Sequence, residues 1–269
     1  MMPLRVESLF GLIGRKTIYV LDNLHEVSSL INDVFYWTLI SPLKGKQIRF
    51  RAVITEIVRT GYNAVPIVAI IGFFVGVILA LQAAYQLRKF GALIYVADLV
   101  GVSITRELGP IITAIIVAGR SGSAFAAEIG SMKAAEEIDA LDTMGINPVR
   151  FLVVPKLIAL MLMQPALTAF FDLIGMLGGF LLAISLLELY PYSYYVETLN
   201  ALSVKDLLTG LVKAWAFGVV ITLVGAYHGF KVKAGAEEVG MRTTASVVSS
   251  IFLVIFFDFF FTTLFYYFL

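Results

Sequence analysis

The chain has 269 residues, of which 59% are hydrophobic and 14% charged, whereas a typical soluble domain is about 45–50% apolar and about 25% charged. This apolar excess excludes a soluble globule and predicts an integral membrane protein. The 20 Lys and Arg residues nearly balance the 19 Asp and Glu residues, and there are two histidines and no cysteine. This composition argues against a nucleic-acid-binding protein, excludes disulfides and thiolate metal sites, and disfavours a histidine-cluster metal site.

Two helices are expected before the first membrane span. Between residues 20 and 35, apolar residues recur at helical spacing among polar ones, which predicts an amphipathic helix in the cytoplasmic membrane interface. The alternative is a soluble cap packed on the helix bundle. A second, basic helix at about residues 47–62 leads into the membrane as an elbow. We therefore assign residues 1–62 to interfacial and elbow helices and residues 63–269 to a five-span domain.

Five stretches are apolar and long enough to cross a bilayer, which takes about 20 residues of helix. They are residues 65–84, 93–118, 157–187, 207–229 and 246–269. The third is long, but two spans cut from it would each be too short. The sequence therefore predicts an all-α membrane protein with five transmembrane helices.

Basic residues gather on one side of these spans. Eight Lys and Arg residues precede the first span, four lie between the second and third, and three lie between the fourth and fifth. The opposite side has only three. Because cytoplasmic loops are enriched in Lys and Arg, this distribution predicts a cytoplasmic N-terminus and an extracytoplasmic C-terminus.

The loop between the second and third spans carries an acidic helix, expected at about residues 123–144 and ended by Gly145. Its charged residues are Glu128, Lys133, Glu136, Glu137, Asp139 and Asp142. Such a helix can lie in a basic groove of another protein. The alternative is a solvated surface helix. An apolar stripe on the same helix favours a partner: Ile129, Met132, Ile138, Leu141 and Met144.

Among the ionisable residues inside predicted spans, four form a candidate charge network: Arg106, Glu107, Lys213 and Asp258. Such residues are functional candidates because burying a charge in a bilayer is costly. Pro110 cannot donate a hydrogen bond to the Arg106 carbonyl, which predicts a kink here. We expect Lys213 to pair with Glu107, and Asp258 with Arg106. The network either couples span movement to transport or only holds the bundle together, and both readings stay open.

Small residues line one face of the first span at four-residue spacing: Gly72, Gly76, Ala80 and Ala84. In the third span, Asp172, Gly175 and Gly179 share a face. Small residues let helices approach closely, so we expect these faces to be packing surfaces.

Long contiguous motifs cover the region from the second span to the third: Arg-Glu-Leu-Gly-Pro at 106–110, Ala-Gly-Arg-Ser-Gly-Ser at 118–123, Ala-Glu-Ile-Gly at 127–130 and Met-Gly-Ile-Asn-Pro at 144–148. With Gly178-Gly179 and Arg242-Thr243-Thr244, they make residues 50–269 closely resemble the MlaE family. Members of that family are permease subunits of ABC transporters that move phospholipids or related lipids between bacterial membranes and are tied to outer-membrane lipid asymmetry.

The resemblance implies a homodimer in the bacterial inner membrane, with two ABC ATPase subunits, an extracytoplasmic MCE-domain protein and a small STAS-type accessory protein as partners. The acidic helix would then be the coupling helix that docks on the ATPase, through Glu128, Lys133, Glu136, Glu137, Asp139, Asp142 and Gly145. The resemblance also implies a lipid cavity at the dimer axis. Its candidate lining residues are Ile78, Gln82, Tyr85 and Leu108.

The chain has no ATP-binding motif of its own. The string nearest to the phosphate-binding loop GxxxxGK[ST] begins at Gly11, but Arg15 occupies the position of the required second glycine. We therefore expect a non-catalytic subunit without a cofactor, with ATP and magnesium bound by a partner ATPase.

Two alternative functions remain. A secondary transporter could use Glu107 or Asp258 for protons, but it would leave the acidic helix unexplained, and five spans do not divide into two repeats. An intramembrane serine protease of the GxSG type could use Ser121 with His228 as base. The GxSG string lies inside the longer permease-like motif, and the known family of such proteases has at least six spans.

Overall fold

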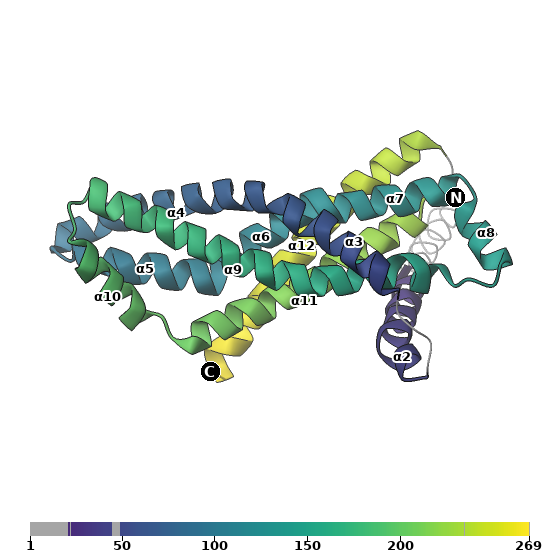
Figure 1. The fold of residues 1–269 in the computed structure, drawn as a ribbon, viewed down its shortest axis with the longest axis horizontal. Helices are drawn as coiled ribbons and strands as arrows, with labels where there is room; N and C mark the ends of the chain where they lie inside the picture. The colour runs from purple at the N-terminus through teal and green to yellow at the C-terminus, as the bar shows by residue number, and fades with distance from the viewer. Residues whose placement is uncertain (1–20, 22, 45–48, 234, 269) are drawn as a thin grey trace, which may run out of the picture.

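The computed structural model describes residues 21, 23–44, 49–233 and 235–268, and every regular element in these ranges is helical. The helices form an elongated bundle, with the helix over residues 23–35 at one end (Figure 1). The predicted all-α fold is confirmed. The parts of the two expected N-terminal helices that fall on residues 20, 22, 47 and 48 lie outside the described residues.

The helical elements follow one another with short connections. In chain order they are η1 (Tyr36–Ile40), α2 (Ser41–Leu43), α3 (Phe50–Thr60), η2 (Tyr62–Ala64), α4 (Val65–Leu87), η3 (Arg88–Phe90), η4 (Leu93–Tyr95), α5 (Val96–Ser103), η5 (Ile104–Leu108), α6 (Gly109–Val117), η6 (Ala118–Gly122), α7 (Ser123–Ala134), α8 (Glu137–Thr143), η7 (Val149–Val153), α9 (Val154–Ser185), α10 (Pro191–Ala201), α11 (Val204–Phe230) and α12 (Ala236–Phe268).

Five continuous helical stretches are long and apolar enough to cross a membrane: Phe50–Phe90, Leu93–Ala134, Val149–Ser185, Val204–Phe230 and Ala236–Phe268. Each contains most or all of one predicted span. The stretches are longer than predicted because their ends continue as helix into polar sequence, which hydropathy does not count as membrane-spanning.

The second stretch is interrupted where the sequence predicts a kink. Residues Ile104–Leu108 form a wide π turn, in which the Gly109 amide donates to the Ile104 carbonyl. Pro110 follows and has no amide hydrogen to donate, so the regular α-helical ladder cannot run through this point. The wide turn adds a residue locally and changes which sides of the helix Arg106 and Glu107 face.

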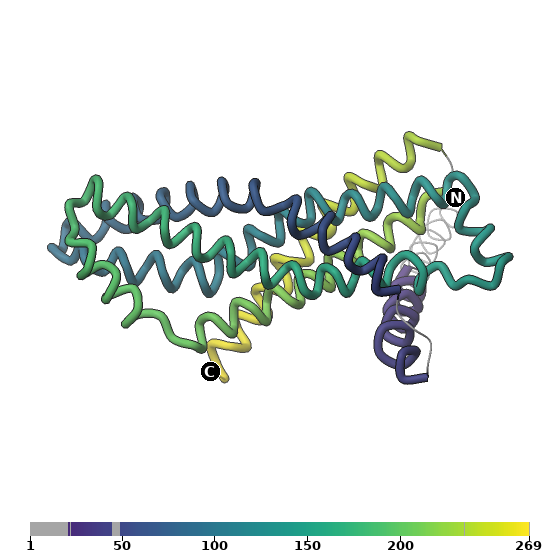
Figure 2. The backbone as a smooth tube through the Cα atoms, viewed as in Figure 1, coloured from purple at the N-terminus to yellow at the C-terminus, as the bar shows by residue number. Residues whose placement is uncertain are grey.

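The small-residue ridge brings α4 against α9, and the two helices run side by side in Figure 2. A Cβ atom built on Gly76 would lie 1.8 Å from the carbonyl oxygen of Gly175, and one on Gly178 would lie 2.4 Å from that of Phe73. The backbones therefore touch at these positions, and the predicted packing role of the ridge is confirmed.

The predicted helix over residues 123–144 is divided in the structure. Its first half, α7, continues the second membrane stretch, and its Phe125 and Ile129 side chains are buried in the bundle. Glu136 has a left-handed backbone with φ of 59°, which turns the chain away from the axis of α7. The α8 helix therefore starts as a new helix after this residue. Gly145, with φ of 73°, terminates α8 as predicted. Only α8 is the separate helix that the sequence led us to expect.

Candidate functional site

An ion cluster lies in the middle of the bundle around Lys213 of α11. Its ammonium group is 2.6 Å from a carboxylate oxygen of Glu107 and 3.0 Å from one of Asp258 on α12. It also donates to the Thr262 hydroxyl at 2.7 Å. Lys213 is only 1% exposed, so these acidic neighbours offset the cost of burying its ammonium group. The predicted pairing of Lys213 with Glu107 is confirmed.

The predicted pairing of Asp258 with Arg106 is wrong. Arg106 makes an ion pair with Asp206 at 2.6 Å, in the first turn of α11. Adjacent helical residues point about 100° apart, so Arg106 and Glu107 reach different parts of α11. Asp206 also accepts from the Ser203 backbone amide at 2.9 Å and closes a capping box. Asp206 lay just before the predicted span, although the Ser203-x-x-Asp206 spacing was a visible capping signal.

A small cavity of about 160 Å³ opens beside this cluster. Its lining combines charged, hydroxyl and aromatic groups: Arg106, Glu107, Thr209, Lys213, Thr262, Phe265 and Tyr266. The cluster therefore presents both signs of charge to one space between η5, α11 and α12. Such a site can hold a zwitterionic or hydrated polar group inside an otherwise apolar bundle.

The candidate lipid-facing residues of α4 lie on its uncovered side. Ile78 is 56% and Tyr85 66% exposed, and Gln82 is exposed with them, whereas Ala80 is fully buried. Leu108 of η5 is half-buried. The predicted division of α4 into an open face and a packing face is thus confirmed. That the open face binds lipid remains a prediction.

Among the predicted coupling residues, Glu128 is engaged inside the subunit. It accepts from Lys156 of α9 at 2.8 Å and is bound by Arg59 of α3. Lys156 also donates to Glu56 of α3 at 2.7 Å. Glu128 therefore connects α7 to α3 and α9. Its position in an acidic segment of the sequence did not predict this internal role.

The other acidic residues of the predicted coupling segment are exposed at one end of the molecule. They are Glu136, Glu137, Asp139 and Asp142, and Asp139 pairs with Lys133 at 2.7 Å. Ile138 and Leu141 of the same helix are buried. The α8 helix thus packs on its own subunit by its apolar side and presents its acidic side to solvent.

The structure does not bring together the residues of the protease alternative. His228 lies beside Ser249 of α12, with its Nε2 atom 3.1 Å from the Ser249 hydroxyl. The hydroxyl of Ser121 is buried and has no hydrogen-bond partner within the described part of the chain. A Ser–His dyad needs hydrogen-bond contact between its two members, and the structure shows Ser121 and His228 without it.

The five apolar helices, the kinked second span and the buried ion cluster define a polytopic all-α membrane protein. The family model described as Permease MlaE matches residues 53–264. The chain therefore belongs to the MlaE permease family, as its motifs indicated.

Named relatives extend over most of the chain. A probable ABC transporter permease protein of Rickettsia bellii is 36% identical over 241 residues, covering 90% of this chain and 91% of the relative. A probable ABC transporter permease protein of Synechocystis is 37% identical, with 78% and 79% covered. The intermembrane phospholipid transport system permease protein MlaE of Haemophilus influenzae is 35% identical, with 78% and 82% covered.

Proposed function

We propose that this chain is the membrane subunit of an ATP-driven transporter that moves phospholipids or related lipids between bacterial membranes. It acts as a homodimer in the inner membrane, with a cytoplasmic N-terminus and a periplasmic C-terminus. The observation that carries the proposal is the open apolar side of α4, which faces away from the subunit's own core along most of the helix. The phospholipid role named for the Haemophilus influenzae relative supports the same substrate class.

The lipid cavity lies at the dimer axis between the open faces of α4 and α12. The exposed side of α12 is large, aromatic and aliphatic: Val248, Phe252, Ile255, Phe256, Phe259 and Phe260. Two copies of these faces would form a continuous apolar wall, which is what an acyl chain requires. The ion cluster at Lys213 connects α11 to η5 and α12. Movement of α11 relative to α12 would therefore change the contacts within the cluster.

A separate ATPase supplies the energy, and α8 transmits its movement. The exposed acidic side of α8 is complementary to a basic groove on such a partner. From α8, force passes through α7 to Glu128, which is bound to α3 and α9 through Arg59 and Lys156. Since α3 leads into α4, this chain of contacts connects the ATPase surface to the lipid-facing helix.

Reversing charges on the exposed side of α8 tests this assignment. The double variant Glu137→Lys with Asp142→Lys should release the ATPase from the purified complex, while the permease stays folded because both side chains are solvated. The measurement is co-purification of the ATPase from the native membrane together with ATP-driven lipid transfer in proteoliposomes. The matched control is Glu237→Lys, a reversal of an exposed acid at the start of α12. Full ATPase binding by the double variant would refute the coupling role of α8.

A further inference from the structure

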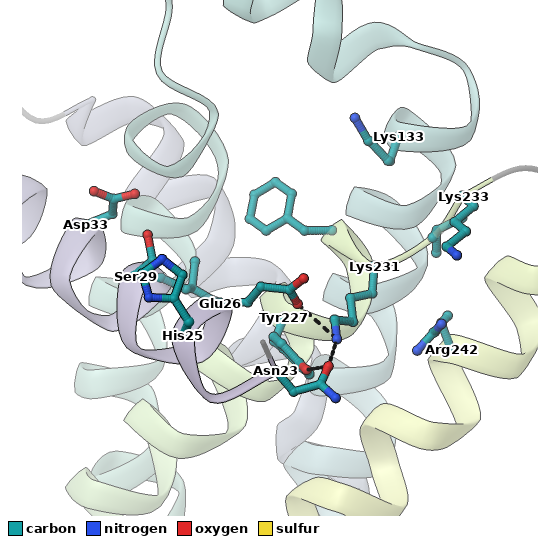
Figure 3. A pocket seen from close by; sticks show the side chains of 13 residues that line it. Asn23, His25, Glu26, Ser29, Asp33, Lys133, Tyr227, Lys231, Lys233 and Arg242 are labelled. Atoms are coloured by element: carbon teal, nitrogen blue, oxygen red, sulfur yellow. Dashed lines mark hydrogen bonds and ion pairs between the residues drawn. The ribbon is translucent and has the colours of Figure 1, made fainter. Parts of the chain in front are cut away.

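A large cavity lies away from the lipid-facing side of α4, at the end of the bundle where α7 and α11 end and α12 begins. It has a volume of about 860 Å³, within the usual range of ligand pockets. The helix over residues 23–35 forms its other wall (Figure 3). The transport path through α4 does not use this space, and the acidic surface of α8 meets it only through Lys133, which pairs with Asp139.

Cations outnumber anions around the cavity. Its basic lining residues are Lys133, Lys231, Lys233 and Arg242, and its acidic ones are Glu26 and Asp33. Figure 3 shows Lys231 between Glu26 and Asn23 on one side and Arg242 on the other. The lining residues carry a formal excess of two positive charges, but Asp139 and Glu238 outside the lining pair with Lys133 and Arg242. An anionic ligand would therefore be drawn by Lys231, by Lys233 and by the remaining donors of Arg242.

Among these cations, Lys231 is the one whose ammonium group contacts side chains of the helix over residues 23–35. Its ammonium is 2.9 Å from Glu26 and also contacts the side-chain oxygen of Asn23, which accepts from the Tyr227 hydroxyl at 3.2 Å. Burial lowers the pKa of Lys231, but hydrogen bonding to Tyr227 and the Glu26 carboxylate raise it by more, so its pKa lies above the usual value. The Lys231 ammonium is therefore charged at neutral pH. The Glu26 carboxylate occupies the position in which an external anion would contact it.

Arg242 and Lys233 have hydrogen-bond donors that no ion pair in the described part of the chain uses. Arg242 lies 3.5 Å from Glu238 by one of its nitrogens, and a guanidinium has five hydrogens to donate. Within the described ranges, no carboxylate pairs with the Lys233 ammonium. Arginine and lysine together are the side chains that bind phosphate oxygens.

The position of the cavity matches the level of lipid headgroups. Lys231 directly follows the membrane-crossing stretch Val204–Phe230. The ends of such a span reach the polar headgroup region of a bilayer. Leu30, Phe230 and Val232 add an apolar part to the lining, which suits the glycerol backbone and the first methylenes of acyl chains.

We infer that this cavity binds the phosphate group of an anionic phospholipid from the adjacent leaflet, with Lys231 and Arg242 as its ligands. Basic pockets between transmembrane helices at the cytoplasmic side are suited to such headgroups. Glu26 competes with the phosphate for Lys231, so binding exchanges the Glu26 contact for the lipid and loosens the helix over residues 23–35 from α11. The inference rests on membrane embedding and does not depend on the transport role.

Titration with fluorescent phosphatidylglycerol tests the site, using the full chain in phosphatidylcholine nanodiscs. Lys231→Gln and Arg242→Gln should each weaken binding about fivefold, the effect of removing one cation near an anionic lipid. Glu26→Gln should strengthen binding, because it removes the competing carboxylate. A variant that merely disturbed folding could not bind more tightly, so this opposite effect separates the site from a structural defect.

Arg51→Gln is the matched control, since Arg51 is an exposed arginine on α3 outside the cavity; its affinity should equal that of the unchanged protein. Equal weakening by Arg51→Gln and Arg242→Gln would reduce the effect to diffuse surface charge and overturn the inference. So would unchanged or weaker binding by Glu26→Gln. Displacement of the lipid by inorganic phosphate at matching concentrations would assign the site to free phosphate instead.

Discussion

Replacing Lys213 with methionine should damage the protein more than almost any other single change, because it strands two carboxylates inside the bundle. Glu107 and Asp258 both contact the Lys213 ammonium, and without it they face one another with no cation between them. Breaking a buried ion pair from one side costs about 3–5 kcal/mol. The measurement is thermal or denaturant stability of the purified variant in detergent.

Two comparisons make this result specific to the cluster. Neutralising both acids in the same chain, as Glu107→Gln with Asp258→Asn, should restore much of the stability lost in Lys213→Met. Lys133→Met removes a solvent-exposed pair with Asp139 and should cost about 0–1 kcal/mol. Equal losses for Lys213→Met and Lys133→Met would contradict the buried ion cluster.

The second large effect is expected at Gly76. Its Cα faces the backbone of α9, and an alanine Cβ would lie 1.8 Å from the Gly175 carbonyl oxygen and 2.6 Å from its carbonyl carbon. Because backbone atoms cannot rotate away as a side chain can, Gly76→Ala must force α4 and α9 apart. Overpacking of this kind costs about 1–3 kcal/mol and sometimes more, so the yield of folded protein and its thermal midpoint should both fall.

Gly240→Ala provides the control for this prediction. Gly240 lies in α12, where no heavy atom is within 4 Å of an added Cβ, so alanine should be tolerated and should slightly favour the helix. If Gly76→Ala proved as stable as Gly240→Ala, the close approach of α4 to α9 would be wrong.

The sequence was sufficient for features that depend on one helix at a time. The five spans follow from hydropathy, and the packing faces of α4 and α9 follow from small residues at helical spacing, because small residues allow backbones to touch. That these two faces meet each other is shown only by the structure. The pairing of Lys213 with Glu107 was also within reach, since few opposite charges exist at that depth.

Features that depend on how a helix is rotated about its axis could not be predicted from the sequence. The π turn at Ile104–Leu108 shifts the direction of Arg106, and no periodicity in the residues reports that shift. Arg106 consequently meets Asp206, which hydropathy had placed outside the span. Composition likewise treats residues 123–144 as one polar helix, whereas burial of Ile129 ties the first half to the bundle and the backbone turn at Glu136 releases the second.

We propose that phospholipid moves along the open face of α4 under the control of ATP. The most direct test of this movement is a photo-crosslinker at position 78, in the complete complex in proteoliposomes containing labelled phospholipid. Position 80 is the control, because Ala80 is buried against the subunit itself. We expect position 78 to label lipid to an extent that changes when ATP is hydrolysed, and position 80 to label protein. Capture of protein alone at position 78, or lipid labelling that ATP leaves unchanged, would contradict ATP-driven movement of lipid along α4.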